Sequence, residues 1–171
     1  MSAPEGWFAA SIAADLQNIP DYNTVINGAL AKDQKIPTPN VLLNQGNFFD
    51  PVTSIWMPPA GLVVLGSYCV WELESGQAVP EGSYIALKIR KNGGDYIPFQ
   101  AAAILSDDPE IGRGIAPTSP AALGTNGEIM DVSSGTDTYE LYMAFFVAAG
   151  ALHRLQATGN RTRFWGIAFG A

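Results

Sequence analysis

The chain has 171 residues, of which 47% are hydrophobic and 11% aromatic, so it is long and apolar enough for one domain with its own core. Its formal net charge is -7 and only 9 residues are Lys or Arg, which argues against nucleic acid as the main partner, because phosphate binding needs clustered cations. No apolar stretch is long enough to span a bilayer, and the first residues show neither the basic segment nor the apolar run of a secretory signal. We therefore expect a soluble protein made in the cytoplasm, with no nucleic acid and no membrane among its partners.

The first 40 residues differ from the rest and predict a short, partly helical N-terminal arm. Asp21 is placed to cap a helix over residues 22–31. Pro37 and Pro39 then extend the chain. The apolar side chains near the N-terminus either pack back on their own domain or dock on a partner protein, and both alternatives stay open. The candidate docking residues are Trp7, Phe8, Ile12 and Leu16.

From residue 41 onward, apolar and β-branched runs alternate with clusters of Gly, Pro, Asn and Asp. The predicted strands are 41–44, 54–57, 61–71, 83–91, 128–133, 138–148, 151–156 and 162–169. Hairpin signals lie at 92–94, 133–137, 148–150 and 158–160. Residues 98–127, rich in Ala, Pro, Gly and Asp, predict a long excursion. The pattern predicts an all-β fold for residues 41–171, a two-sheet antiparallel sandwich or jelly roll.

Three of the predicted strands, 61–71, 138–148 and 162–169, are apolar on both faces, although the side chains of a strand alternate between faces. Only one face of each sheet in a sandwich meets the core, so a sheet built from these strands would leave a second apolar face uncovered. Burial of that face favours self-association. The alternative is that the first 40 residues or the excursion at 98–127 covers it within one chain.

The order of short motifs from residue 44 onward resembles the globular head of complement first-component q and its relative, tumour necrosis factor. The motifs are Asn-Gln-Gly-Asn-Phe-Phe-Asp-Pro from 44, Ile-Trp-Met-Pro-Pro-Ala-Gly-Leu-Val-Val from 55, Tyr-Ile-Ala-Leu-Lys-Ile-Arg-Lys-Asn-Gly from 84, Ser-Gly-Thr-Asp-Thr-Tyr-Glu-Leu from 134 and Thr-Arg-Phe-Trp-Gly-Ile-Ala-Phe from 162. The chain departs from the family at Val63 and Val64, which replace an aromatic pair, and at Thr136, which lengthens a turn.

The resemblance implies a jelly roll that forms a homotrimer, with the three two-sided strands in the sheet that lines the three-fold axis. It places on the trimer interface Val64, Tyr68, Tyr142, Phe146 and Phe164. It places in the sandwich core Trp71, Leu141, Met143, Trp165, Ile167 and Phe169. It also places Glu140 near the axis, where the carboxylate would need either a solvated end of the axis or an ion pair, for which Arg154 and Arg163 are the candidates.

The sequence holds no recognisable catalytic constellation, so we expect no enzyme and no cofactor. The single histidine, His153, is more typical of a strand residue than of a base, and the single cysteine, Cys69, more typical of a small buried residue than of a nucleophile. The carboxylates of Asp107, Asp108 and Glu110 could hold Ca²⁺, but a solvated acidic loop is favoured and no metal site is predicted. Whether the loop 98–127 binds a ligand stays open.

A short arm and a trimeric head, without a signal peptide or a collagen stalk, resemble proteins on the virions of tailed bacteriophages. The resemblance implies a structural virion protein that decorates, or cements, the phage capsid and binds the major capsid protein or another virion protein through residues 1–40. The alternative is the tip of a tail fibre or head fibre that binds a receptor or a host surface glycan. A decoration protein lacking residues 1–40 should lose shell binding but keep its trimer, whereas a tip protein should still bind cells.

Overall fold

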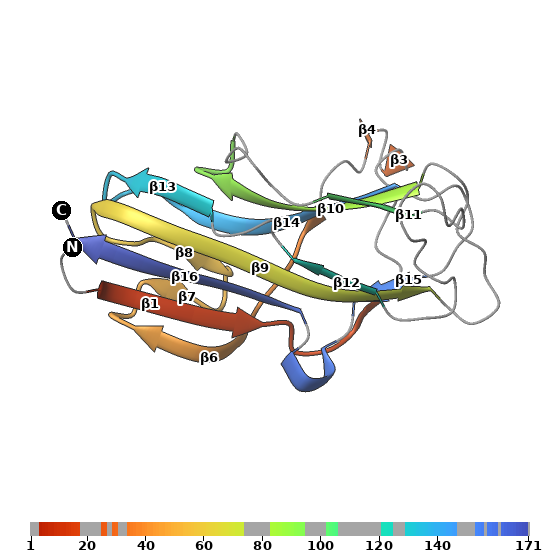
Figure 1. The fold of residues 1–171 in the computed structure, drawn as a ribbon, viewed down its shortest axis with the longest axis horizontal. Coiled ribbons are helices and arrows are strands. Elements are labelled where there is room, and N and C mark those ends of the chain that lie inside the picture. The colour runs from red at the N-terminus through yellow and green to blue at the C-terminus, as the bar shows by residue number, and fades with distance from the viewer. Residues whose placement is uncertain are drawn as a thin grey trace.

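The computed structural model describes residues 4–17, 25–26, 29–30, 34–73, 83–94, 102–105, 121–124, 129–146, 153–155, 157–160 and 162–170. In this part of the chain the strands form two packed antiparallel sheets (Figure 1). The helical element among these residues is a single 3-10 turn, η1 (Thr158–Asn160). The described residues include no helix with the length and hydrophobicity that a bilayer span requires.

Among the described residues, the larger sheet contains eight strands. They are β1 (Pro4–Ser11), β2 (Leu16–Gln17), β6 (Asn40–Gln45), β9 (Gly61–Leu73), β12 (Ala121–Gly124), β13 (Ile129–Ser133), β15 (His153–Leu155) and β16 (Arg163–Gly170). The 13 residues of β9 run along the sandwich and pair with β13 and β16 at one end and with β12 and β15 at the other. β1 lies between β16 and β6 and pairs with both, so the first strand of the chain is an inner strand of the sheet.

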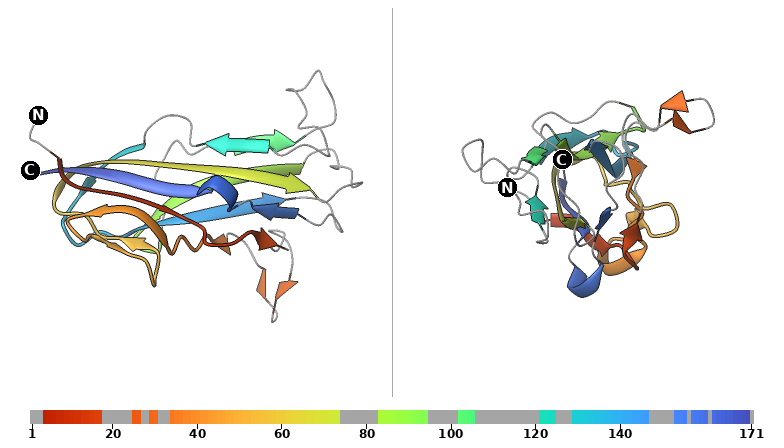
Figure 2. Two further views of the ribbon diagram at one scale, coloured as in Figure 1. Left: turned by 90° about the horizontal axis from the view of Figure 1, so that it is seen from below. Right: turned by 90° about the vertical axis from the view of Figure 1, so that its right-hand side faces the viewer.

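The smaller sheet contains six strands in the part of the chain that is described. It lies against the larger sheet, as the end-on view in Figure 2 shows. They are β5 (Gln34–Lys35), β7 (Phe49–Asp50), β8 (Ile55–Trp56), β10 (Ser83–Lys91), β11 (Ala102–Leu105) and β14 (Tyr139–Phe146). β14 pairs along most of its length with β10 and also contacts β5 and β8. A separate two-stranded ladder joins β3 (Val25–Ile26) to β4 (Ala29–Leu30).

Every strand predicted from residue 41 onward is present, and β10 has the predicted bounds. The all-β, two-sheet antiparallel prediction is therefore confirmed. The excursion predicted at 98–127 contains two strands, β11 and β12, which the sequence pattern does not reveal. The hairpin signal at 148–150 lies outside the described residues.

Two of the hairpin predictions are wrong. β13 pairs with β9 in the larger sheet whereas β14 pairs with β10 in the smaller, so residues 133–137 carry the chain from one sheet to the other. β14 therefore does not share a sheet with β9 and β16, contrary to prediction. The turn at 158–160 is also not a hairpin, because β15 and β16 both run antiparallel to β9 and pair with successive parts of it.

An aromatic cluster centred on Phe8 joins the two sheets. Its ring is 2% exposed and stacks on Phe49 with centroids 4.8 Å apart. It also lies 4.9 Å from Trp56 and meets Phe164 edge-on at 4.8 Å. A Cβ at position 166 would lie 2.7 Å from the Trp56 ring and 2.9 Å from the Phe8 ring, so only Gly166 leaves room for them. The core thus depends on a residue from the first strand of the chain.

Residues that were candidates for a docking arm belong to this core. Phe8 and Ile12 are each 2% exposed, and Leu16 packs against the core cluster. Trp7, which alternates with Phe8 along β1, is 40% exposed on the other face of the sheet. The prediction that Phe8 and Ile12 dock on a partner is therefore wrong, because the apolar face of β1 packs into the sandwich of its own chain.

The helix predicted over residues 22–31 is also wrong for the residues that the structure describes there. β3 and β4 pair as a ladder, with Val25 opposite Leu30 and Ile26 opposite Ala29. The sequence between these strands is Asn27-Gly28, the dipeptide most favoured in two-residue hairpins, a sequence signal that agrees with the strand pair.

Residues 34–38 are tied to the smaller sheet by backbone hydrogen bonds. The amide of Ile36 donates to the carbonyl of Leu141 at 2.9 Å, and the amide of Thr38 donates to Ser54 Oγ at 2.8 Å. With β1 in the larger sheet and β5 in the smaller, the first 40 residues contribute strands to both layers.

Candidate functional site

The outer face of the larger sheet is apolar across five strands. Three rows of side chains point away from the core: Met130, Val64, Ile167 and Trp7; then Val132, Leu62 and Phe169; then Trp165, Ala9 and Leu43. We call this set the outer apolar face. Met130 and Val132 are 69% and 66% exposed, and Leu43, Trp7 and Leu62 are 45%, 40% and 37% exposed. Contiguous exposed apolar side chains of this kind mark an interaction site.

The outer apolar face is bordered along one side by polar residues. Trp165 lies across Gly66 of β9, where a Cβ would overlap the indole ring. In the next row along the sheet, the Arg163 guanidinium lies 5.5 Å from the centre of the Tyr68 ring. Beside it, Asn40 Nδ2 donates to Ser11 Oγ at 2.9 Å. An apolar centre with a polar rim is the usual anatomy of a protein–protein interface.

The structure separates the five predicted interface residues. Val64 and Tyr68 lie on the outer side of β9, next to or within the outer apolar face. Tyr142 is on β14 in the smaller sheet, so it does not share their surface. Phe146 is on the same strand, but its side chain lies outside the described residues.

The predicted direction of the side chains of β16 is wrong. Phe164 is 0% exposed and lies in the core against Phe8, whereas Trp165, Ile167 and Phe169 point to the other side and are only half-buried. The register with β9 sets this direction. Phe164 faces Ser67 and Ala168 faces Val63, which puts the even-numbered residues of β16 on the core side.

On β14 the predicted direction is correct, because Leu141 and Met143 are 1% and 0% exposed in the core. The side chain of Trp71 lies outside the described residues. Glu140 does not lie beside the larger sheet. It points to the outer side of the smaller sheet, is 7% exposed and forms an ion pair with Lys35. Its predicted pairing with Arg154 or Arg163 is therefore wrong, because β14 belongs to the other layer.

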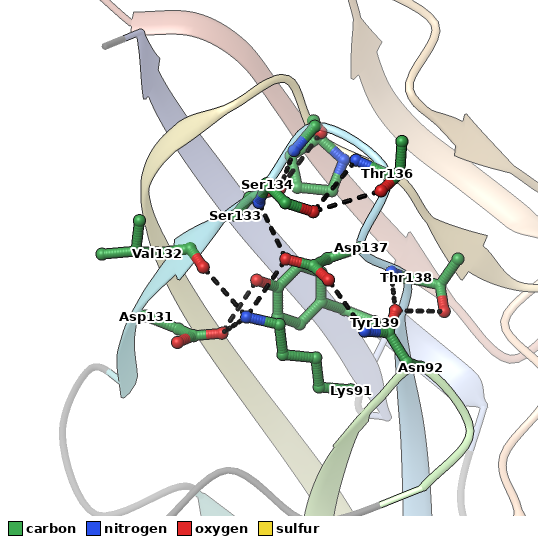
Figure 3. A network of polar contacts seen from close by, with 12 residues as sticks. Lys91, Asn92, Asp131, Val132, Ser133, Ser134, Thr136, Asp137, Thr138 and Tyr139 are labelled. Carbon is green, nitrogen blue, oxygen red and sulfur yellow. Dashed lines mark hydrogen bonds and ion pairs between the residues drawn. The ribbon is translucent and has the colours of Figure 1, made fainter.

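A polar network closes one end of the sandwich (Figure 3). Lys91 Nζ, at the end of β10, lies 2.9 Å from Asp131 Oδ2 on β13. It also lies 3.1 Å from Asp137 Oδ2, in the segment 133–137 that connects the two sheets. The buried Tyr139 hydroxyl donates to Asp131 at 2.9 Å. Asn92 Nδ2 donates to Asp137 Oδ1 at 2.7 Å, and the Ser134 amide donates to Asp137 Oδ2 at 2.8 Å. The network therefore ties the smaller sheet, the larger sheet and the segment between them.

The charges of this network are held in their ionised forms. The hydrogen bond from Asn92, followed by that from the Ser134 amide, holds the pKa of Asp137 far below its ordinary value. Burial would raise the pKa of Asp131, but hydrogen bonds from Lys91 and Tyr139 outweigh it and lower that pKa. Burial would lower the pKa of Lys91, but its two carboxylate partners outweigh it and raise that pKa. These groups do not exchange protons near neutrality, so the chemistry fits a structural clamp.

The remaining candidates from the sequence concern metal and nucleophile chemistry. Cys69 is not in a disulfide with any described residue and is fully buried in the core, which confirms its prediction as a small buried residue. Asp107, Asp108 and Glu110, together with most of the loop 98–127, lie outside the described residues, as does the side chain of His153. Within the part of the chain that is described, no group of three or more His, Cys, Asp or Glu side chains is arranged to hold a metal ion.

No protein-family model matches the sequence, and no curated protein sequence matches it. Solved structures do match the fold, among them the structure of Eiger TNF from S. frugiperda. That match has a TM-score of 0.50 with 10% sequence identity and covers 97% of this chain and 91% of that chain. At this identity the match shows the fold alone, which is a tumour necrosis factor-like jelly roll.

Proposed function

We propose that the protein acts by binding rather than by catalysis, as a homotrimer that closes on the outer apolar face of the larger sheet. The observation that carries the proposal is the exposure of the apolar side chains Met130, Val132 and Trp7 within the outer apolar face. Association would remove these side chains from water, at roughly 25 cal/mol for each Å² of apolar surface buried. The tumour necrosis factor-like fold and the motif resemblance support three-fold rather than two-fold symmetry.

The proposal is tested by placing a charge in the outer apolar face. Ile167→Glu should convert a trimer into a monomer, because three carboxylates would be buried without partners, while the subunit stays folded since Ile167 points away from the core. Analytical ultracentrifugation of both proteins measures the change. The matched control is Val52→Glu in the turn between β7 and β8, where the side chain is 91% exposed and the trimer should persist. A wild-type chain that sediments as a monomer contradicts the proposal.

Within this class we propose a structural role on a virion, as a trimeric decoration protein of a phage capsid with the major capsid protein as its partner. The order of sequence motifs supports the trimeric jelly roll, and the virion role rests on the resemblance of such a trimeric head to proteins on phage virions. The route of attachment differs from the first expectation: Phe8 and Ile12 are in the core, so attachment has to use another surface. A receptor- or glycan-binding fibre tip is the second candidate.

Immunogold labelling decides between these two roles. An antibody raised against the purified protein is applied to particles from a lysate of the cells that carry the gene. A decoration protein predicts gold distributed over the particle heads, since many copies cover a shell. Gold confined to fibre tips supports the second candidate, and particles without any gold contradict a virion role.

A further inference from the structure

The outer face of the smaller sheet carries a cluster of cations around one tyrosine. Lys88 on β10 pairs across the sheet with Tyr142 on β14, and Tyr142 pairs in turn with Lys35 on β5. Arg90, two residues after Lys88, faces Glu140. These side chains point outward because Leu87 and Ile89, which alternate with them along β10, are 0% exposed in the core. We call Lys35, Lys88, Arg90 and Tyr142 the basic cluster.

Contacts within the sheet hold the basic cluster in place. The Arg90 guanidinium lies 4.3 Å from the centre of the Tyr142 ring, a distance at which the cation and the aromatic face attract each other. Lys35 is held by its ion pair with Glu140. Long cationic side chains that are already fixed lose less conformational entropy when a partner binds them.

The basic cluster reverses the charge of the protein locally. Its three cations, Glu140 and the nearby Asp50 of β7 sum to +1 among the described residues of this face, from 3 positive and 2 negative charges, in a chain of net charge -7. An acidic partner is repelled by the molecule as a whole and attracted at this face. Such an arrangement orients a partner and selects its charge.

We propose that the basic cluster is a docking surface for an acidic protein. Arg and Tyr are enriched in the central residues of protein interfaces, and a sheet face offers a flat surface to a folded partner. The cluster is less suited to binding a glycan, because Arg90 covers one side of the Tyr142 ring, on which a sugar would stack. The inference rests on the proposed function in one respect: a trimer closed on the larger sheet leaves the smaller sheet facing outward.

The test uses two immobilised polyanions, poly-L-glutamate as a chain of protein-like carboxylates and dextran sulfate as an acidic polysaccharide. The wild-type protein should bind poly-L-glutamate, and the binding should weaken as salt is raised, because salt screens partly exposed charges. Lys88→Glu reverses one charge of the cluster and should weaken this binding about tenfold or more. Biolayer interferometry measures both affinities.

The matched control is the double variant Ala13→Glu with Ala14→Glu, an equal charge change at two exposed residues between β1 and β2 of the larger sheet, which should leave binding within about twofold of wild type. Equal binding by wild type and Lys88→Glu, or no binding of poly-L-glutamate by wild type, overturns the proposal. Preferential capture by dextran sulfate, lost in Lys88→Glu, overturns the choice of a protein partner. Sedimentation of each variant reports the trimer separately, so failure of the proposed function is distinguished from failure of this surface.

Discussion

Phe8→Ala is expected to lower the free energy of unfolding by about 3–5 kcal/mol, the range found when a buried aromatic ring is removed from a core. The ring is 2% exposed and contacts Phe49, Trp56 and Phe164, so its loss leaves a cavity between the two sheets. The cavity cannot close easily, because Gly166 already brings the backbone of β16 against the same rings. Urea unfolding followed by tryptophan fluorescence measures the change, at a fixed protein concentration.

Glu5→Ala is the control on the same strand. Glu5 is exposed, so its truncation should change the free energy of unfolding by no more than about 0.5 kcal/mol. If Phe8→Ala were equally mild, β1 would be a detachable arm and not an inner strand. The same reasoning predicts that deleting residues 1–40 does not leave a folded trimer. The deletion removes β1 from the larger sheet, leaves β6 without its pairing partner, and removes β5 from the smaller sheet.

Asp137→Ala is expected to lower the free energy of unfolding by about 2–4 kcal/mol, because hydrogen bonds to a charged group are worth more than neutral ones. The carboxylate accepts hydrogen bonds from Asn92 and the Ser134 amide and pairs with Lys91, and removing it leaves all three donors without this acceptor. Chemical denaturation measures the loss. The control is Thr136→Ala in the same segment, whose exposed hydroxyl lies 3.2 Å from Ser134 Oγ and whose removal should have little effect.

The same carboxylate predicts how stability depends on pH. The pKa of Asp137 is lowered on folding, so its contribution is fully present above the unfolded value of about 3.9 and is lost as pH falls through the lower folded value. Asp131 acts in the same direction. The difference in unfolding free energy between wild type and Asp137→Asn should therefore be constant near neutrality and shrink below about pH 4. A difference that stays the same down to pH 3 contradicts an ionised clamp.

The two sheets expose outer faces of different character. The larger sheet presents exposed Met130, Val132 and Trp7, whereas the smaller presents Lys88 and Arg90. Self-association and partner docking would then use opposite sides of one sandwich. Each can be perturbed by a single substitution without touching the other, which is why Ile167→Glu and Lys88→Glu are informative as a pair.

The residues of a candidate site were only partly predictable. Val64 and Tyr68 lie on the outer side of the larger sheet as predicted, but Phe164 lies in the core. Met130 and Val132, the most exposed members of the outer apolar face, were not identified. The sequence of β13 predicts the opposite orientation. Asp131 and Ser133 alternate with Met130 and Val132, and polar residues normally face water, so the apolar pair is expected in the core. Asp131 is turned inward by the bonds that it forms with Lys91 and Tyr139, which lie on β10 and β14 of the opposite sheet.

The sequence by itself determined three things: that the protein is all-β, at which positions most strands after residue 41 lie, and that some strands have apolar residues on both sides. Only the tertiary structure decided which side faces the core and which sheet each strand joins. When one face of a strand is exposed to water, apolar and polar residues alternate along it and predict which face is buried, as Leu87 and Lys88 do in β10. A strand that is apolar on both sides carries no such signal, so the orientation of Phe164 follows from its register opposite Ser67, a pairing that no local pattern encodes.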